Sequence, residues 1–192
     1  MNTTRRYNMS ARHAAAEATR SRILDAAAQA FITHWFDEVT IQAVAADAGV
    51  SGQTVLNHFG DKETLFAAAA GRLSEQIESR RGEAPPGDVD AAIDALVHDY
   101  EVTGDGVIRA LALEERVPSL RPLLAQGRDF HRAWVERTFD RPDLVVELVV
   151  ATDVYAWKLL RRDQGLSRDA TRDAMHRIVL ALLALDPEDE ES

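Results

Sequence analysis

The chain has 192 residues, 46% of them hydrophobic, and contains no cysteine, which excludes disulfides, thiolate metal sites and a cysteine nucleophile. No apolar run reaches the roughly 18–20 residues that span a bilayer, and no apolar stretch follows the first basic residues, so we expect a cytoplasmic protein without a membrane span or signal peptide. The net charge is −10, but residues 1–81 hold nine basic and nine acidic residues, so the excess acid lies entirely after residue 81.

The segments between the few glycine and proline clusters are rich in Ala, Leu, Arg and Glu, which favour helices. The sequence therefore predicts an all-α protein with about nine helices. A valine-rich run at 144–150 would also suit a strand, but it continues to residue 160 without a breaker, and its length favours a buried helix.

Four helices are predicted in the N-terminal part. The first covers 17–33, where apolar residues recur with helical spacing. Two short helices follow within 40–59, and the fourth begins after Asp61, a favourable N-cap, and ends near residue 81. Residues 1–12 are expected to be disordered in the free protein.

The segment Glu83-Ala84-Pro85-Pro86-Gly87 is the strongest break in the chain, because two prolines and a glycine cannot easily continue a helix. We place a domain boundary there, between 1–81 and 82–192. The later helices are predicted over 88–102, 105–116, 119–139, 142–163 and 167–185.

Residues 40–59 have the spacing of a helix-turn-helix. Thr40 can cap the first short helix, Ser51 can cap the second, and Gly49 can supply the positive φ of a tight turn between them. Two short helices joined by such a glycine-containing turn are typical of this motif. The second helix carries small or hydrogen-bonding groups and no carboxylate outside its apolar side, as a helix that enters the negatively charged major groove requires.

The order Thr-Ile-Gln-Ala-Val-Ala, Ala-Gly-Val-Ser, Thr-Val, His-Phe, Asp-Lys-Glu and Leu-Phe resembles the tetracycline-repressor (TetR) family over residues 17–70. The resemblance implies that residues 1–81 form an N-terminal arm, a three-helix DNA-binding domain and a connecting helix. It implies that 82–192 form a helical domain that binds a small effector and dimerises through its last two helices. The implied function is a repressor that a small-molecule effector releases from a palindromic operator in double-stranded DNA. A transcriptional activator and an effector-independent regulator share the motif and stay open.

The resemblance also implies roles for single residues. Thr40 and Gln42 would face phosphates, the start of the second helix would enter the groove, and His58 and Lys62 would contact flanking phosphates. His58 could instead cap its helix. The predicted DNA-contact set is Thr40, Gln42, Ser51, Gly52, Gln53, Thr54, Asn57, His58 and Lys62.

The sequence departs from the family at Leu56 and Asn57, where aromatic residues are usual. Leu56 cannot donate a hydrogen bond to a phosphate, while Asn57 could replace that contact or read an adenine edge. The N-terminal arginines allow two interpretations, a solvated tail or an arm in the minor groove. These arginines are Arg5, Arg6 and Arg12.

The sequence of the second domain indicates its function less clearly than that of the first. Its last helix leaves little polar face, which agrees with the implied dimer interface. Aromatic side chains with polar tips suit a mostly apolar effector pocket, so the predicted effector is small and apolar or aromatic. Ordinary core packing is the alternative for each candidate. The pocket candidates are Tyr100, Leu111, Phe130, His131, Trp134, Tyr155 and Trp157.

We predict no enzymatic activity, catalytic residue, metal site or cofactor. The sequence has no His-Glu-x-x-His zinc motif, no nucleophile elbow and no glycine-rich phosphate loop. His98, His131 and Asp153 are scattered. A helical scaffold that uses the motif only for packing is the remaining alternative.

Overall fold

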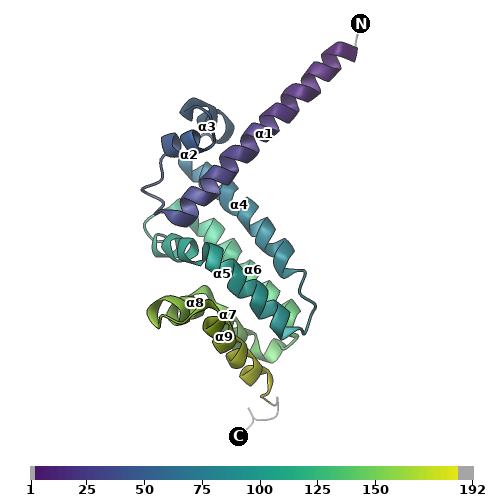
Figure 1. The fold of residues 1–192 in the computed structure, drawn as a ribbon, viewed down its shortest axis with the longest axis vertical. Coiled ribbons are helices and arrows are strands. Elements are labelled where there is room, and N and C mark those ends of the chain that lie inside the picture. Colours follow the sequence, from purple (N-terminus) through teal and green to yellow (C-terminus); the bar gives the residue numbers. More distant parts are fainter. Residues whose placement is uncertain (1–2, 186–192) are drawn as a thin grey trace. The chain divides into compact units, whose positions relative to one another are not determined.

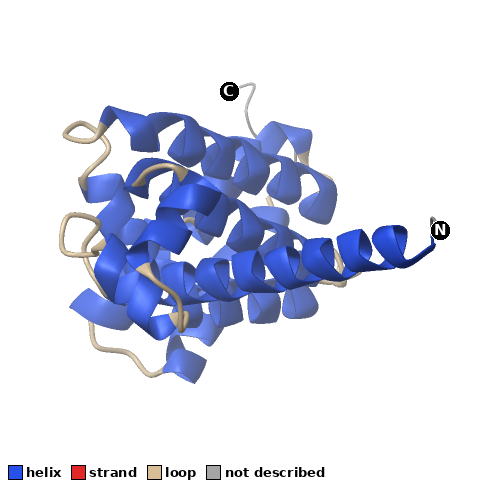
Figure 2. Cartoon of the chain, turned by 90° about the horizontal axis from the view of Figure 1, so that it is seen from above, coloured by secondary structure: helices blue, strands red, loops and turns tan. Residues whose placement is uncertain are grey.

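The structure, a computed structural model, describes the backbone of residues 3–185 and the side chains of residues 12–185, and every regular element within them is a helix (Figure 2). The all-α prediction is therefore confirmed. Figure 1 shows the elements, which in chain order are α1 (Thr3–Thr33), α2 (Ile41–Asp47), α3 (Gly52–Phe59), α4 (Lys62–Arg81), α5 (Val89–Ala112), the 3-10 turn η1 (Pro118–Leu120), α6 (Arg121–Phe139), the 3-10 turn η2 (Pro142–Leu144), α7 (Val145–Thr152), α8 (Val154–Lys158), the π-helical segment η3 (Leu159–Asp163) and α9 (Arg168–Leu183).

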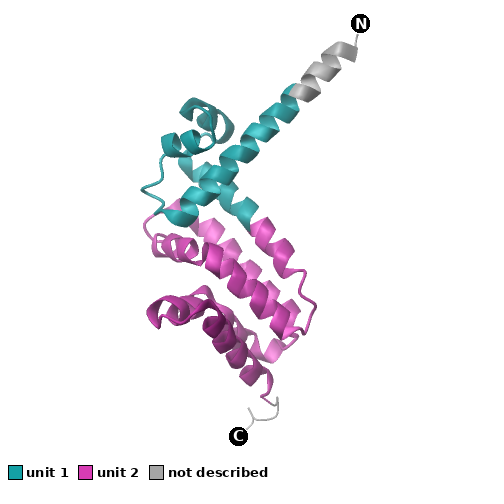
Figure 3. Ribbon diagram, in the orientation of Figure 1, with its two compact units in different colours: residues 1–73 teal, residues 74–192 magenta. Residues whose placement is uncertain are grey.

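The chain divides into two compact units, Met1–Leu73 and Ser74–Ser192 (Figure 3). The sequence placed the boundary at residue 81, so the division found in the structure lies about two helical turns earlier. The difference arises in the last turn of α4, where Arg80 and Arg81 both form ion pairs with Asp99 of α5. These ion pairs hold the end of α4 against α5, so that it belongs to the second unit.

In unit 1, α1 begins at Thr3, well before the predicted start at residue 17, so a helix replaces the disorder that we expected from residue 3 onward. Residues 3–16 contain several alanines and neither glycine nor proline, which favours helix there. The side chains of Arg5 and Arg6 lie outside the described residues, and Arg12 is exposed.

The core of unit 1 includes a cluster of three aromatic rings from α1, the following loop and α4. The ring centroids of Phe31, Phe36 and Phe66 lie between 4.6 and 5.8 Å apart, and all three side chains are buried. Each buried phenylalanine stabilises the fold by roughly 1.5–3 kcal/mol relative to an exposed one. The cluster anchors the loop that leads into α2.

In unit 2, α5 is one continuous helix where the sequence predicted two, because Gly104 does not break it. A glycine inside a helix costs only about 1 kcal/mol relative to alanine, and packing offsets that cost here. A Cβ atom on Gly104 would lie 2.5 Å from Cζ3 of Trp157, so the bare glycine lets the buried indole ring approach the helix.

The predicted helix 142–163 is instead divided at Asp153. The backbone of Asp153 is extended (φ −69°, ψ 154°), and its carboxylate accepts a hydrogen bond of 2.8 Å from the amide of Tyr155. Asp153 therefore ends α7 and caps α8, a role that its position inside an apolar run concealed.

No helix between residues 3 and 185 is both long and apolar enough to cross a membrane.

Candidate nucleic-acid interface

The turn between α2 and α3 is built from two helix caps and one glycine. Thr40 Oγ1 accepts a hydrogen bond of 3.1 Å from the amide of Ala43, and Ser51 Oγ accepts one of 3.1 Å from the amide of Thr54. Gly49 has φ +67°, a left-handed conformation that glycine adopts without strain. These three features agree with the geometry that the sequence predicted for a helix-turn-helix.

One side of α3 is buried and the other is exposed. Val55 is fully buried and Phe59 is 6% exposed, so these two side chains fix the helix on unit 1. On the other side Gln53, Leu56 and Asn57 are exposed. Because α3 contains no carboxylate, its exposed side can approach a phosphate backbone without charge repulsion.

The polar groups at the start of α3 are already connected to one another. Ser51 Oγ and Thr54 Oγ1 lie 2.9 Å apart in a hydrogen bond, and Gln53 Nε2 donates to Asn57 Oδ1 at 3.0 Å. His58 is half-buried beside the ring of Phe59, at a centroid distance of 6.2 Å. The predicted contact residues of α3 thus form a small ordered surface.

Asp61 and Lys62 order the junction of α3 and α4. The carboxylate of Asp61 accepts a hydrogen bond of 2.7 Å from the amide of Thr64, which lowers the pKa of Asp61 below its usual value. Lys62 Nζ donates to the carbonyl oxygens of Phe36, at 2.7 Å, and Val39, at 3.1 Å. Lys62 therefore holds the loop before α2, and one of its three N–H groups remains for another acceptor.

Thr40 and Gln42, the candidates on α2, are both exposed. Gly52 sits close to α2, where a Cβ atom would meet the side chain of Ile41 at 3.8 Å, an ordinary contact. The nine predicted contact residues therefore all lie within unit 1, on α2 and α3, at their N-caps and at the start of α4.

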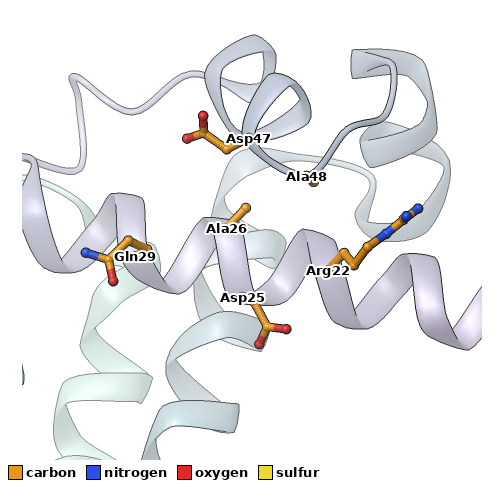
Figure 4. Close-up of a pocket in the computed structure, with 6 residues that line it drawn as sticks. All are labelled: Arg22, Asp25, Ala26, Gln29, Asp47 and Ala48. Carbon is orange, nitrogen blue, oxygen red and sulfur yellow. The ribbon is translucent and has the colours of Figure 1, made fainter.

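Unit 1 also has an open pocket of about 340 Å³ that the sequence did not predict (Figure 4). Figure 4 shows α1 side chains on one side and the end of α2 on the other. Asp25 pairs with Arg72 at 2.9 Å. The lining residues are Arg22, Asp25, Ala26, Gln29, Asp47 and Ala48.

The pocket candidates of unit 2 occupy different environments. Tyr100, Trp134 and Trp157 belong to the hydrophobic core, and Leu111 packs against its edge. Tyr155 is 53% exposed and lies on the surface. The structure thus gathers most of these candidates around one core and leaves Tyr155 outside it.

A buried polar network crosses this core. Arg81 is 5% exposed and lies over the rings of Tyr100, Phe130 and Trp134, at 5.4, 5.8 and 5.1 Å from their centroids. Burial raises the pKa of Tyr100 to about 12, and its hydroxyl donates to the carbonyl oxygen of Thr152 at 3.0 Å. Sequence reasoning missed Arg81 and Asp99, since nothing in their local spacing distinguishes a buried ion pair from an exposed one.

Exposed apolar side chains gather on the last elements of unit 2. We call this set the terminal apolar side chains. They are large and between 44% and 65% exposed. No large hydrophobic side chain on α6 is exposed to this extent. The set consists of Val146, Val150, Tyr155, Leu159, Ile178 and Leu180.

No group of three or more His, Asp or Glu side chains within the described part of the chain is arranged to hold a metal ion.

Residues 23–69 match a family model described as "Bacterial regulatory proteins, tetR family". Among curated proteins, the chain is 41% identical over 64 residues to the HTH-type transcriptional regulatory protein RaaS of Mycobacterium tuberculosis. It is 30% identical over 124 residues to the HTH-type transcriptional repressor Rv1474c of the same organism. These matches cover 33% and 63% of this chain, and the chain spans only 30% and 59% of the length of the two relatives.

Solved structures share the fold over most of the chain. A tetR-family transcriptional regulator from Streptomyces coelicolor superposes with a TM-score of 0.68 at 20% identity, covering 90% of this chain and 91% of the other. The multidrug binding protein EbrR, in complex with imidazole, gives a TM-score of 0.59 at 24% identity, covering 83% of this chain and 88% of the other.

Proposed function

We propose that this chain, whose residues 23–69 match the model of the tetR family of bacterial regulatory proteins, is a homodimeric transcriptional repressor. Unit 1 binds a palindromic operator in double-stranded DNA, and a small-molecule effector bound by unit 2 releases it. The observation that carries the proposal is the capped α2–turn–α3 pair, whose exposed side offers hydrogen-bonding groups and no carboxylate. This function involves no catalysis and no cofactor, and it places the protein in the cytoplasm with its DNA.

In the proposed complex α3 enters the major groove and its flanks contact the backbone. Phosphate contacts fix the position of the protein, while base contacts give it specificity. Lys62 would use its remaining N–H group on a phosphate. The backbone contacts come from Thr40, Gln42, His58 and Lys62, and the groove contacts come from Ser51, Gly52, Gln53, Thr54 and Asn57.

Dimerisation is proposed through the elements that carry the terminal apolar side chains. Large exposed apolar patches commonly mark a protein–protein interface. They lie on α7, α8, η3 and α9, and α9 packs against α7 and α8. A two-fold dimer would present two copies of α3 to half-sites about 34–36 Å apart.

The effector is proposed to bind in the core of unit 2, among Tyr100, Leu111, Phe130, His131, Trp134 and Trp157. Trp134 Nε1 is buried and makes no hydrogen bond within the described residues, so it offers a donor to a polar atom of a bound molecule. The similar protein EbrR is a multidrug binding protein, which favours a small-molecule effector for this chain also. Tyr155, being exposed, belongs with the proposed dimer interface.

DNA binding is tested by footprinting the promoters of the protein's own gene and its neighbours. We expect protection of one palindromic site by the wild-type protein at physiological salt. The double variant Gln53→Ala, Thr54→Ala should keep its circular dichroism spectrum and lose the footprint. Gln76→Ala, which changes an exposed glutamine of unit 2, is the matched control and should protect the site. Absence of any protected palindrome would contradict the proposal.

The dimer is tested by sedimentation of the variant Val150→Glu. A buried, unpaired carboxylate is strongly unfavourable in an apolar interface, so we expect this variant to sediment as a monomer. Ala125→Glu places the same charge on the exposed face of α6 and should leave the dimer intact. A dimeric Val150→Glu variant would assign the interface to other elements.

Release is tested by fluorescence anisotropy of labelled operator in the presence of a panel of small apolar and aromatic compounds. A compound that dissociates the complex without unfolding the protein supports the effector site. Trp134→Phe removes the indole donor and should weaken the response to such a compound. If no compound of the panel releases the operator, the effector-independent alternative is favoured.

A further inference from the structure

The exposed side of α3 places three side chains of different chemistry next to each other. Residues 53, 56 and 57 stand at positions i, i+3 and i+4, which are neighbours on a helix surface. Gln53 and Asn57 are exposed amides, and Leu56 is an apolar side chain that is 39% exposed. Ser51 precedes α3 as its N-cap, and Thr54 is less exposed than these three side chains. We therefore expect Gln53, Leu56 and Asn57 to be the main residues that distinguish one base from another.

The hydrogen bond between the two amides determines which groups of Gln53 remain free. Gln53 Nε2 donates one N–H to Asn57 Oδ1 at 3.0 Å. A glutamine amide has two N–H groups and one carbonyl oxygen. When the N–H that points away from Oε1 serves Asn57, the other N–H and Oε1 remain together on one edge of the amide.

That edge matches one base in the major groove. Adenine offers N7 as an acceptor and N6–H as a donor, which a glutamine amide can engage with two hydrogen bonds. Guanine offers two acceptors, N7 and O6, so the Gln53 carbonyl would face an acceptor there. Asn57 acts as a positioning residue, because its Oδ1 holds the nitrogen of Gln53 on one side.

Leu56 adds a second, apolar preference. The only apolar group that base edges expose in the major groove is the C5-methyl group of thymine. An exposed leucine on the helix side that faces the groove gains by contact with that methyl and cannot compensate for a polar base edge.

We propose that Gln53, held by Asn57, reads an adenine in each half-site and that Leu56 contacts the methyl group of a nearby thymine. This inference rests on the proposed operator binding and adds the base composition that the operator must have. The discriminating unit is a coupled amide pair, so adenine preference depends on Asn57 as well as on Gln53.

The experiment begins with selection of bound DNA from a random pool by the wild-type dimer. Anisotropy is then measured on the selected site with single base analogues. Replacing the read adenine by 7-deazaadenine removes N7 and should weaken wild-type binding by about tenfold, but should not weaken Gln53→Ala further. Replacing the thymine by deoxyuridine removes the methyl group and should weaken wild-type binding, but not binding of Leu56→Ala.

Asn57→Ala separates positioning from simple contact. We expect it to reduce the preference for adenine over guanine at the read position while the salt dependence of binding stays unchanged, because no phosphate contact is lost. Gln76→Ala should retain the wild-type base preferences. All three α3 variants change exposed side chains, and circular dichroism checks that they fold.

The outcomes separate this inference from the proposed function. If the wild-type protein selects no DNA, both are overturned. If it selects a palindrome but Gln53→Ala and Asn57→Ala leave every base preference unchanged, the repressor proposal stands and the adenine assignment is overturned. A guanine at the position that depends on Gln53 overturns the assignment as well.

Discussion

Arg81 donates a hydrogen bond of 2.9 Å from Nε to Oδ2 of Asp99, and both side chains are almost completely buried in unit 2. Arg80 pairs with the same carboxylate from a more exposed position. Arg81 also donates to His131 Nδ1 at 3.3 Å. One carboxylate thus compensates the charge that the end of α4 brings into the core.

The first prediction concerns Asp99. Removing one partner of a buried ion pair leaves an uncompensated charge, so Asp99→Ala should lower the unfolding free energy by about 3–5 kcal/mol. Urea denaturation measures the change. Glu136→Ala, which breaks an exposed pair with Arg132, is the matched control and should cost at most about 0.5 kcal/mol. Similar losses in the two variants would show that the Asp99 pair is not needed for stability.

The second prediction concerns pH. Burial, reinforced by the charge of Arg81, lowers the pKa of His131 to about 4 from its usual 6.5. Arg81 can only donate, so Nδ1 accepts, and Nε2–H donates to Thr152 Oγ1 at 3.1 Å, an arrangement that requires the neutral ring. Between these pKa values the unfolded chain binds the extra proton. The stability that neutral His131 contributes is therefore fully present above pH 6.5 and is lost as the pH falls to about 4.

The full loss from His131 amounts to about 3 kcal/mol. Because carboxylates titrate in the same range, the measurement compares the wild-type protein with His131→Gln by urea denaturation across this pH interval. The variant should show the shallower decline in unfolding free energy toward acid. Parallel curves for the two proteins would mean that His131 titrates normally in the folded state.

The third prediction concerns Gly104. A methyl group there would overlap the ring of Trp157, which is fully buried and cannot move aside freely. Overpacking of this kind costs about 1–3 kcal/mol, so Gly104→Ala should lower the melting temperature despite the better helix propensity of alanine. Gly127, on α6, has no atom within 4 Å of the equivalent position, so Gly127→Ala should stabilise the protein by about 0.5–1 kcal/mol.

The fourth prediction concerns Lys62. Its ammonium group donates to two loop carbonyls and lies 4.4 Å from the centroid of the Phe36 ring. Lys62→Ala should therefore lower the unfolding free energy by about 2 kcal/mol, as judged by thermal and urea denaturation. Glu75→Ala, an exposed substitution on the same helix, should change it little. Unchanged stability of Lys62→Ala would show that these contacts do not stabilise the fold.

The local features of the fold could be predicted from the sequence. The caps Thr40 and Ser51 and the turn at Gly49 follow from residues within a few positions of one another, and the structure reproduces them. Features that depend on distant partners could not be predicted. Gly104 resembles a helix breaker until Trp157 is seen against it, more than 50 residues further along the chain.

The candidate DNA-contact residues follow from a local motif, whereas the candidate effector residues do not. A buried tyrosine or tryptophan satisfies the same apolar pattern whether it lines a pocket or fills a core, and only the partners of its polar atom differ. Tyr155 and Trp157 are two residues apart on the same short helix, yet the first is 53% exposed and the second is fully buried. Which of the two side chains is buried depends on where the helix begins again after the break at Asp153.

The three tryptophans of the chain report on two different environments. Trp35 is 42% exposed in the loop before α2, while Trp134 and Trp157 are buried in unit 2. An aqueous quencher such as iodide should therefore reduce the emission of Trp35 selectively, and the remaining blue-shifted emission should follow the core of unit 2. The native chain thus carries its own optical probes, which allow melting of the two units to be recorded in one sample without an added label.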